Sequence, residues 1–185
     1  MNSLRRFWEQ IELANQPIGE EYMAYRMDGA SDKKPDMRLE IGLGTCHSCD
    51  YFTIHGNKIL LIEETCLLKS IANYREKYGS TLEEEKEGKK GNLLNRMIRD
   101  ENVLKIYGSL LVLCHWAAKD RDVANSIREK KHIFWLVISD AESEGDQSRA
   151  LYYADSYLIR KFKGVNLLQD VKILTPSQFK RKLKP

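Results

Sequence analysis

Alternating and continuous apolar positions predict three successive strands in the first third of the chain. The expected strands cover residues 37–43, 49–54 and 58–65. A short glycine-containing link, 55–57, joins the last two and predicts a tight hairpin. Residues 59–62 of the third strand are all apolar, which is typical of a central strand covered on both faces. The pattern therefore predicts a three-strand meander.

Apolar residues spaced three and four apart predict helices around this meander. Ser3 can cap a first helix whose apolar face consists of Leu4, Phe7, Trp8 and Ile11. Further helices are expected at residues 20–26, at 66–78, twice or more within 92–130, and at 148–163. Two further strands are expected at residues 132–139 and 171–174.

A last helix begins after the final strand. Thr175 can cap it, Pro176 suits its first position, and Gln178 follows three residues after the cap. The chain then has the order α-β-β-β-α-β-α-β-α, with a helical insertion at about residues 80–130. A meander followed by a helical crossover to another strand implies an α/β fold. We expect a mixed sheet flanked by helices, in a single domain spanning residues 1–185.

The composition is that of an ordinary globular chain, with 42% hydrophobic and 31% charged residues. It excludes disordered, collagenous and disulfide-knot classes. The N-terminal residues become polar before a signal-peptide core can form, and the longest apolar stretch, 103–118, is interrupted by Lys105 and His115. We therefore expect an intracellular, cytoplasmic protein that does not cross a membrane.

Four cysteines are expected as free thiols in that compartment. Cys46 and Cys49 are separated by two residues, which is half of a zinc-site pattern. Only Cys66 or the Cys114-His115 pair could complete such a site. A zinc-stabilised interaction module therefore remains one hypothesis for this chain.

Charge is divided unevenly along the chain. Residues 156–185 contain eight basic residues and one acid, or +7, which leaves −4 for residues 1–155 of the net +3. A solvated C-terminal helix accounts for this distribution, and so does a surface that contacts phosphates.

Two acidic residues stand at the open end of the predicted hairpin. Asp50 opens the second strand of the meander, and Glu63 ends the apolar run of the third. Two carboxylates held close together in a buried sheet are costly unless a cation lies between them. Mg²⁺ or Mn²⁺ suits oxygen ligands. A solvated pair of acids at strand ends is the alternative interpretation.

The segment from Asp50 to Thr65 resembles a known nuclease motif. An acid, a hairpin, an apolar strand and then Glu63-Glu64-Thr65 is similar to the pattern of the PD-(D/E)xK superfamily, which has the restriction-endonuclease-like fold with an α-β-β-β-α-β core. Thr65 stands where that pattern has lysine. In this respect the chain resembles the cap-snatching endonuclease domains of segmented negative-strand RNA virus polymerases, in which the lysine lies on the following helix. Lys77 or Lys69 would be that lysine.

The resemblance implies a divalent-metal-dependent endonuclease. Asp50 and Glu63, with the backbone carbonyl of Glu64, would bind Mg²⁺ or Mn²⁺, and metal-activated water would hydrolyse phosphodiester bonds of RNA or DNA. A third ligand is expected from Glu40 on the first strand, or else from Glu20 or Glu21. The residues expected to contact phosphates are Lys161, Lys163, Lys180 and Arg181.

Thr65 in the lysine position also supports a different hypothesis. The chain would then be a catalytically degenerate nuclease-fold protein that binds nucleic acid or a protein partner, for example within a larger polymerase or defence complex. Metal binding at Asp50 and Glu63 distinguishes the two hypotheses.

Overall fold

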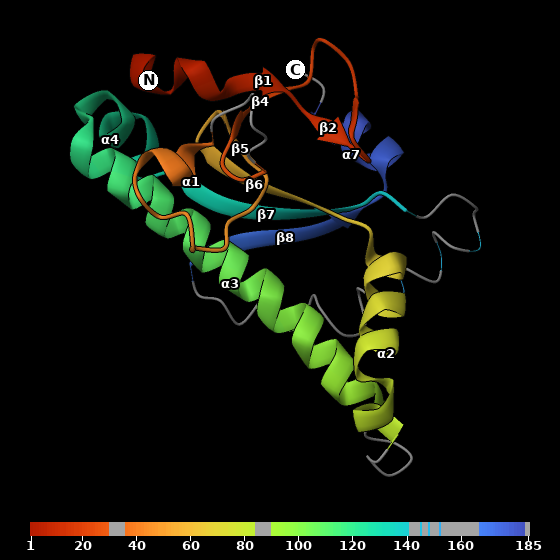
Figure 1. Cartoon of the computed structure of the whole chain (residues 1–185). Coiled ribbons are helices and arrows are strands. Elements are labelled where there is room, and N and C mark those ends of the chain that lie inside the picture. Colours follow the sequence, from red (N-terminus) through yellow and green to blue (C-terminus); the bar gives the residue numbers. More distant parts are fainter. Residues whose placement is uncertain are drawn as a thin grey trace.

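A computed structural model describes residues 1–29, 36–83, 90–140 and 167–183, together with the single positions 145, 148 and 152. The described part of the chain is a mixed α/β fold built on a six-stranded sheet with the order β1-β4-β5-β6-β7-β8 (Figure 1). This confirms the α/β class and the mixed sheet. The sheet strands are β1 (Trp8–Gln10), β4 (Met23–Arg26), β5 (Tyr51–His55), β6 (Lys58–Thr65), β7 (Lys131–Ile138) and β8 (Leu168–Leu174). A separate two-stranded sheet consists of β2 (Glu12–Leu13) and β3 (Gln16–Pro17).

The helices of the described residues are η1 (Asn2–Phe7), a 3-10 helix, followed by α1 (Met37–Glu40), α2 (Leu67–Glu83), α3 (Lys90–Lys119), α4 (Arg121–Ile127) and α7 (Pro176–Leu183). The predicted helical insertion corresponds to α3 and α4. Figure 1 shows α3 running along the sheet, with α2 beside its N-terminal half. The helix expected at residues 148–163 falls almost entirely outside the described residues.

The hairpin expected at residues 55–57 is present and sets the register of the sheet centre. β5 and β6 pair antiparallel, with His55 opposite Lys58 and Tyr51 opposite Ile62. Gly56 has φ +59°, a left-handed turn conformation that glycine adopts at little cost. β6 then pairs parallel with β7 after the helices α2, α3 and α4, and β7 pairs parallel with β8.

Two predicted elements are wrong, and long-range packing explains both. Residues 20–26 were expected to be helical, but Met23–Arg26 forms β4 because β1 and β5 supply hydrogen bonds on its two sides. Residues 37–43 were expected to be a strand, but Met37–Glu40 forms α1. The Asp36 carboxylate accepts a hydrogen bond from the Leu39 N–H at 2.7 Å, which caps this helix.

The first helix is also shorter than its apolar pattern predicts. It ends at Phe7, and Trp8 begins β1 opposite Tyr25 of β4. Thr175, by contrast, starts α7 as predicted, since the Gln178 N–H donates to Thr175 Oγ1 and the Thr175 N–H donates to Gln178 Oε1. This reciprocal pair is a capping box.

Side chains of alternate strand residues form two separate cores. Phe52 and Leu61 point to the face covered by α3, where they join Ile106 and Leu113 in one buried cluster. Tyr51, Leu60 and Trp135 point to the other face, where Phe179 of α7 packs. No helix in the described stretches combines the length and hydropathy that a bilayer crossing requires.

Candidate functional site

The acidic residues Asp50 and Glu63 stand opposite each other on the central hairpin. Because Tyr51 pairs with Ile62, the next position along the register places Asp50 across from Glu63. Directly opposed residues of an antiparallel pair have Cβ atoms about 5 Å apart. Strand alternation places both carboxyl groups on the α3 face, with Phe52 and Leu61. The structure thus brings together the two acids that the sequence singled out.

Glu63 is one of the most deeply buried charged residues in the described part of the chain. Its residue exposure is 2%. Burial, followed by the negative charge of Asp50, raises the pKa of the Glu63 carboxyl well above its ordinary value. Its Oε2 atom is buried and has no hydrogen-bond partner among the described residues. A buried, unpartnered carboxylate oxygen is available to a ligand.

Asp50 is held by the backbone of the neighbouring strand. The Glu64 N–H donates a hydrogen bond to Asp50 Oδ2 at 2.7 Å. Burial raises the pKa of Asp50 to about 6, although Lys105 and this hydrogen bond act in the opposite direction. The Asp50 carbonyl also accepts the Met27 N–H at 2.8 Å, which secures the start of β5 to the end of β4.

Among the described residues, the cation in contact with Glu63 is Lys105 of α3. Its Nζ atom forms a short ion pair with Glu63 Oε1, and its side chain is 21% exposed. Burial by itself lowers the pKa of Lys105, but Glu63 and Asp50 outweigh that effect, so its pKa is raised. Lys105 therefore stays charged at neutral pH and neutralises part of the buried negative charge.

Lys105 is the site residue that the sequence reasoning missed. It was noted only as an interruption of the apolar stretch 103–118. Lys105 shares a helix face with Ser109, Val112 and Trp116, at spacings of four, seven and eleven residues, and all three are buried. A lone lysine on the buried face of an apolar helix is the signal that could have identified it.

Close packing of α3 against the preceding loop aligns the acids with Lys105. The Cys49 N–H donates to Ser109 Oγ at 2.8 Å, and Ser109 Oγ donates to the Lys105 carbonyl at 2.7 Å. Gly108 lies so near the loop that a Cβ atom there would come within 1.6 Å of the His47 carbonyl oxygen. Glycine at this position is what allows the loop before Asp50 to touch the helix.

Lys69 and Lys77, the lysines expected at the site, both lie on α2 and have exposed side chains. The Lys69 backbone N–H donates to Asp140 Oδ2 at 2.8 Å, near the start of that helix. Lys105 is the lysine that the structure places against Glu63.

The two residues after Glu63 interact with the end of β7. The Glu64 side chain accepts a hydrogen bond from Ser139 Oγ, so this carboxylate is directed toward β7. The Ser139 N–H donates to the Thr65 carbonyl at 3.0 Å, and Thr65 is partly buried. The backbone carbonyl of Glu64 therefore stays a candidate ligand, whereas its carboxylate does not.

The expected third carboxylate does not join the pair in the described residues. Glu40 lies on α1 rather than on a strand, which corrects its predicted position, and forms an exposed ion pair with Arg6 at 2.8 Å. Glu20 and Glu21 are exposed in a turn. No group of three or more histidine, cysteine, aspartate or glutamate side chains suited to a metal occurs in the described parts of the chain.

The absence of a metal-binding group among the described residues extends to groups with cysteine and histidine, so it gives the zinc hypothesis no support. Burial raises the pKa of the Cys49 thiol well above its ordinary value, which disfavours the thiolate that zinc requires. Cys46, Cys66 and Cys114 are free thiols.

The predicted phosphate-contacting residues fall in two groups. Lys180 and Arg181 are on α7, which packs on the sheet face opposite to α3 and the carboxyl pair. Lys161 and Lys163 lie outside the described residues.

Comparisons of the chain with protein-family models, curated proteins and solved structures found no match. A functional assignment therefore depends on the arrangement of Asp50, Glu63 and Lys105.

Proposed function

We propose that this protein is a divalent-metal-dependent nuclease whose site consists of Asp50, Glu63 and Lys105. The observation that carries the proposal is a pair of opposed, buried carboxyl groups, one with an unpartnered oxygen, beside a charged lysine. Burial raises the pKa values of both acids, and the charge of Asp50 adds to the effect at Glu63, so a bound cation would stabilise the charged forms of both.

The order of the sheet supports this proposal. β4, β5 and β6 form an antiparallel meander, helices follow, and β7 returns parallel to β6. This order is similar to the β-β-β-α-β part of the core expected of a restriction-endonuclease-like domain, with the acids at the open end of the β5–β6 hairpin, although α1 lies between β4 and β5 in the chain. The proposed fold family is accordingly the PD-(D/E)xK superfamily.

The donor set fits Mg²⁺ or Mn²⁺ because both favour carboxylate oxygens and complete their coordination with water or substrate phosphate. Asp50 Oδ and Glu63 Oε2 would hold the ion, joined by the Glu64 backbone carbonyl. A divalent ion bound there would lower the pKa of a water molecule and polarise a phosphoryl oxygen. Substrate phosphate would supply the oxygen that a third carboxylate does not.

Lys105 has the role first assigned to Lys77 or Lys69. Its ammonium group lies beside the acids on the same sheet face and is fully charged at neutral pH. It stabilises the negative charge that grows on the phosphoryl oxygens as a water oxygen bonds to phosphorus and the bond to the leaving oxygen breaks. The helix positions Lys105 through the Ser109 hydrogen bonds.

A direct test combines cleavage with metal binding. Asp50→Asn and Glu63→Gln are expected to lower cleavage of RNA or DNA at least about a hundredfold and to abolish Mn²⁺ binding in calorimetric titration. Glu40→Gln is the matched control, since it removes an exposed carboxylate outside the site, and it should retain both activities. Cleavage that survives Glu63→Gln, or EDTA, would overturn the proposal.

The second candidate function is a nuclease-fold protein that binds nucleic acid or another protein without catalysis. The Lys105–Glu63 ion pair favours it, because the lysine already neutralises the acid. So does the finding that no three histidine, cysteine, aspartate or glutamate side chains in the described residues form a group that could hold a metal. This candidate predicts no Mn²⁺ binding by the wild-type protein.

A further inference from the structure

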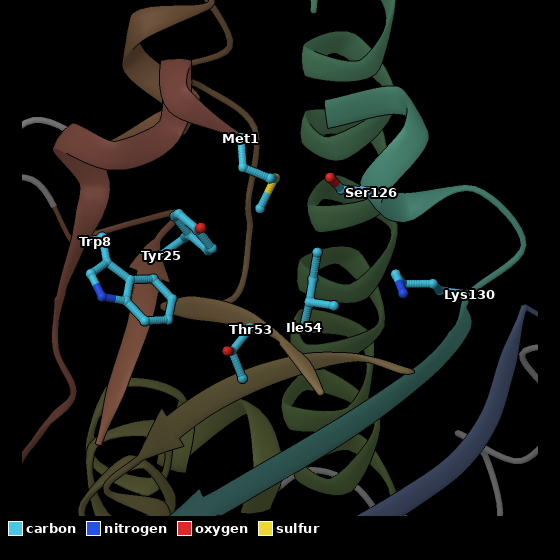
Figure 2. Close-up of a pocket in the computed structure, with 7 residues that line it drawn as sticks. All are labelled: Met1, Trp8, Tyr25, Thr53, Ile54, Ser126 and Lys130. Carbon is cyan, nitrogen blue, oxygen red and sulfur yellow. The ribbon is translucent and has the colours of Figure 1, made fainter. Parts of the chain in front are cut away.

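A second feature lies on the same sheet face, near the end of β5 that is farther from Asp50. It is a hollow of about 340 Å³, lined among others by Trp8, Tyr25, Ile54 and Lys130. Figure 2 shows the indole of Trp8 and the ring of Tyr25 on one side, Lys130 on the other, and β5 residues between them. Its volume is at the lower end of the range for small-molecule sites, about 300–1,000 Å³.

The aromatic wall of this hollow is rigid and partly exposed. The Trp8 and Tyr25 ring centroids are 4.6 Å apart, and Tyr25 stacks on buried Phe52 at 4.9 Å with an interplanar angle of 22°. Trp8 nevertheless remains 41% exposed. An indole that packs on Tyr25 at a tilt of 57° and keeps part of its surface exposed can stack on another flat ring.

A positively charged side chain lies at the opposite wall. Lys130 Nζ donates to the Gly56 carbonyl at 2.7 Å, so this ammonium is held at the rim beside the β5–β6 hairpin. Lys58 and Lys131 are in register on β6 and β7, but strand alternation directs both to the other sheet face, with Leu60 and Ile133. A flat aromatic wall facing the Lys130 ammonium group complements a base joined to a phosphate.

The hollow and the carboxyl pair are aligned on one strand. Asp50 and Ile54 are four residues apart, so they point to the same face with Cα atoms about 13 Å apart at about 3.3 Å per residue. Stacked nucleotides rise about 3.4 Å each, so the separation corresponds to about four nucleotides. Trp8 lies two strands further across the sheet, opposite Tyr25 of β4, so a single strand that occupied both places would need at least this length.

We infer that this hollow binds an unpaired nucleobase, by stacking on Trp8 and by a contact between Lys130 and the adjoining phosphate. The inference rests on the proposed function and makes it more specific, because only a single-stranded region presents an unpaired base. The substrate is thus single-stranded nucleic acid, bound at the hollow and cut at the carboxyl pair.

Tryptophan fluorescence tests the stacking in the wild-type protein. The chain has three tryptophans, and Trp116 and Trp135 are 6% and 5% exposed, so quenching by a bound base reports Trp8. The probe is a short single-stranded oligonucleotide, tested as DNA and as RNA, in EDTA. An oligonucleotide of equal length with abasic sugars carries the same phosphates. We expect quenching by the first and little by the second; equal quenching, or none, would overturn the inference.

Variants separate the base contact from the phosphate contact. Trp8→Ala should weaken oligonucleotide binding about five- to 150-fold, whereas Tyr107→Ala, which removes a comparably exposed aromatic ring from α3, should change it less than about twofold. Lys130→Ala should weaken binding of intact and abasic strands alike and reduce the salt slope by about 0.7. Equal effects of Trp8→Ala and Tyr107→Ala would refute a base site here, provided that circular dichroism shows both variants folded.

These measurements need neither a metal nor cleavage, so the nuclease proposal and the base-binding proposal can be refuted independently. Base-dependent binding without cleavage would refute the nuclease and leave the hollow as a binding site. Cleavage of single strands without base-dependent quenching would refute the inference about the hollow alone.

Discussion

Replacement of Lys105 by methionine tests the electrostatics of the site in the absence of any substrate. The change keeps most of the side-chain volume and removes the charge that contacts Glu63. Removing one partner of a buried ion pair leaves the other uncompensated, which typically costs about 3–5 kcal/mol. We therefore expect Lys105→Met to lower the free energy of unfolding by that amount at about pH 8.

The pH dependence follows from the carboxyl groups. The pKa of Asp50 is about 6 in the folded chain against an ordinary 3.8. The folded state thus holds this proton more tightly than the unfolded state, so the contribution of Asp50 to stability is largest below about pH 4 and is lost as the pH rises through about 6. A shift of about two pKa units corresponds to about 3 kcal/mol. Glu63, whose pKa is raised well above its ordinary value, extends the loss to higher pH.

Lys105→Met should increase the loss of stability at higher pH and leave the stability at low pH nearly unchanged. At about pH 4 both carboxyl groups are protonated in the folded chain, and the variant should be within about 1 kcal/mol of wild type. The assay is urea unfolding in EDTA across this pH range. Lys69→Met removes an exposed lysine of α2 and should cost less than about 0.5 kcal/mol at every pH.

A double variant tests whether Glu63 is the acid that Lys105 neutralises. Glu63→Gln removes the charge that Lys105 neutralises, so Lys105→Met combined with Glu63→Gln should be more stable than the sum of the two single effects by about 1–3 kcal/mol. If the two effects simply add, or if Lys105→Met costs the same at about pH 4 and about pH 8, the buried charge cluster does not exist as described.

Two other substitutions test how the fold supports the site. Gly108→Ala places a Cβ atom 1.6 Å from the His47 carbonyl oxygen, so it should destabilise the chain by about 3 kcal/mol or more and impair cleavage, measured by urea unfolding and nuclease assay. A stability gain, the usual result of glycine to alanine within a helix, would contradict the close contact. Thr175→Ala should cost about 1 kcal/mol in urea unfolding because it removes the cap of α7, whereas Thr175→Ser should retain the cap; equal stability of the two variants would show that the hydroxyl contributes nothing.

Local patterns in the sequence were sufficient for several elements of this protein. The β5–β6 hairpin follows from two apolar strands joined by a glycine-containing link, and its register alone brings Asp50 opposite Glu63. The start of α7 follows from Thr175, Pro176 and Gln178. Each of these features depends on residues that are neighbours in the chain or directly paired across a tight turn.

Tertiary contacts decided the rest. β4 is extended because β1 and β5 pair with it, in spite of a sequence that suits a helix. The hollow beside Trp8 exists because β1, β4, β5 and α4 come together there, and no local sequence pattern indicates this arrangement.

The candidate site shows the same division between local sequence and tertiary packing, with Lys105 as the example. The sequence by itself predicted that two acids converge at the end of a buried hairpin, with a cation between them as one interpretation and solvation as the other. Only the packing of α3 decided that Lys105, 42 residues from Glu63, is the cation in contact with that acid. The physical reason is that helix periodicity shows which residues share a face, whereas the element that this face contacts depends on how the whole chain closes around its core.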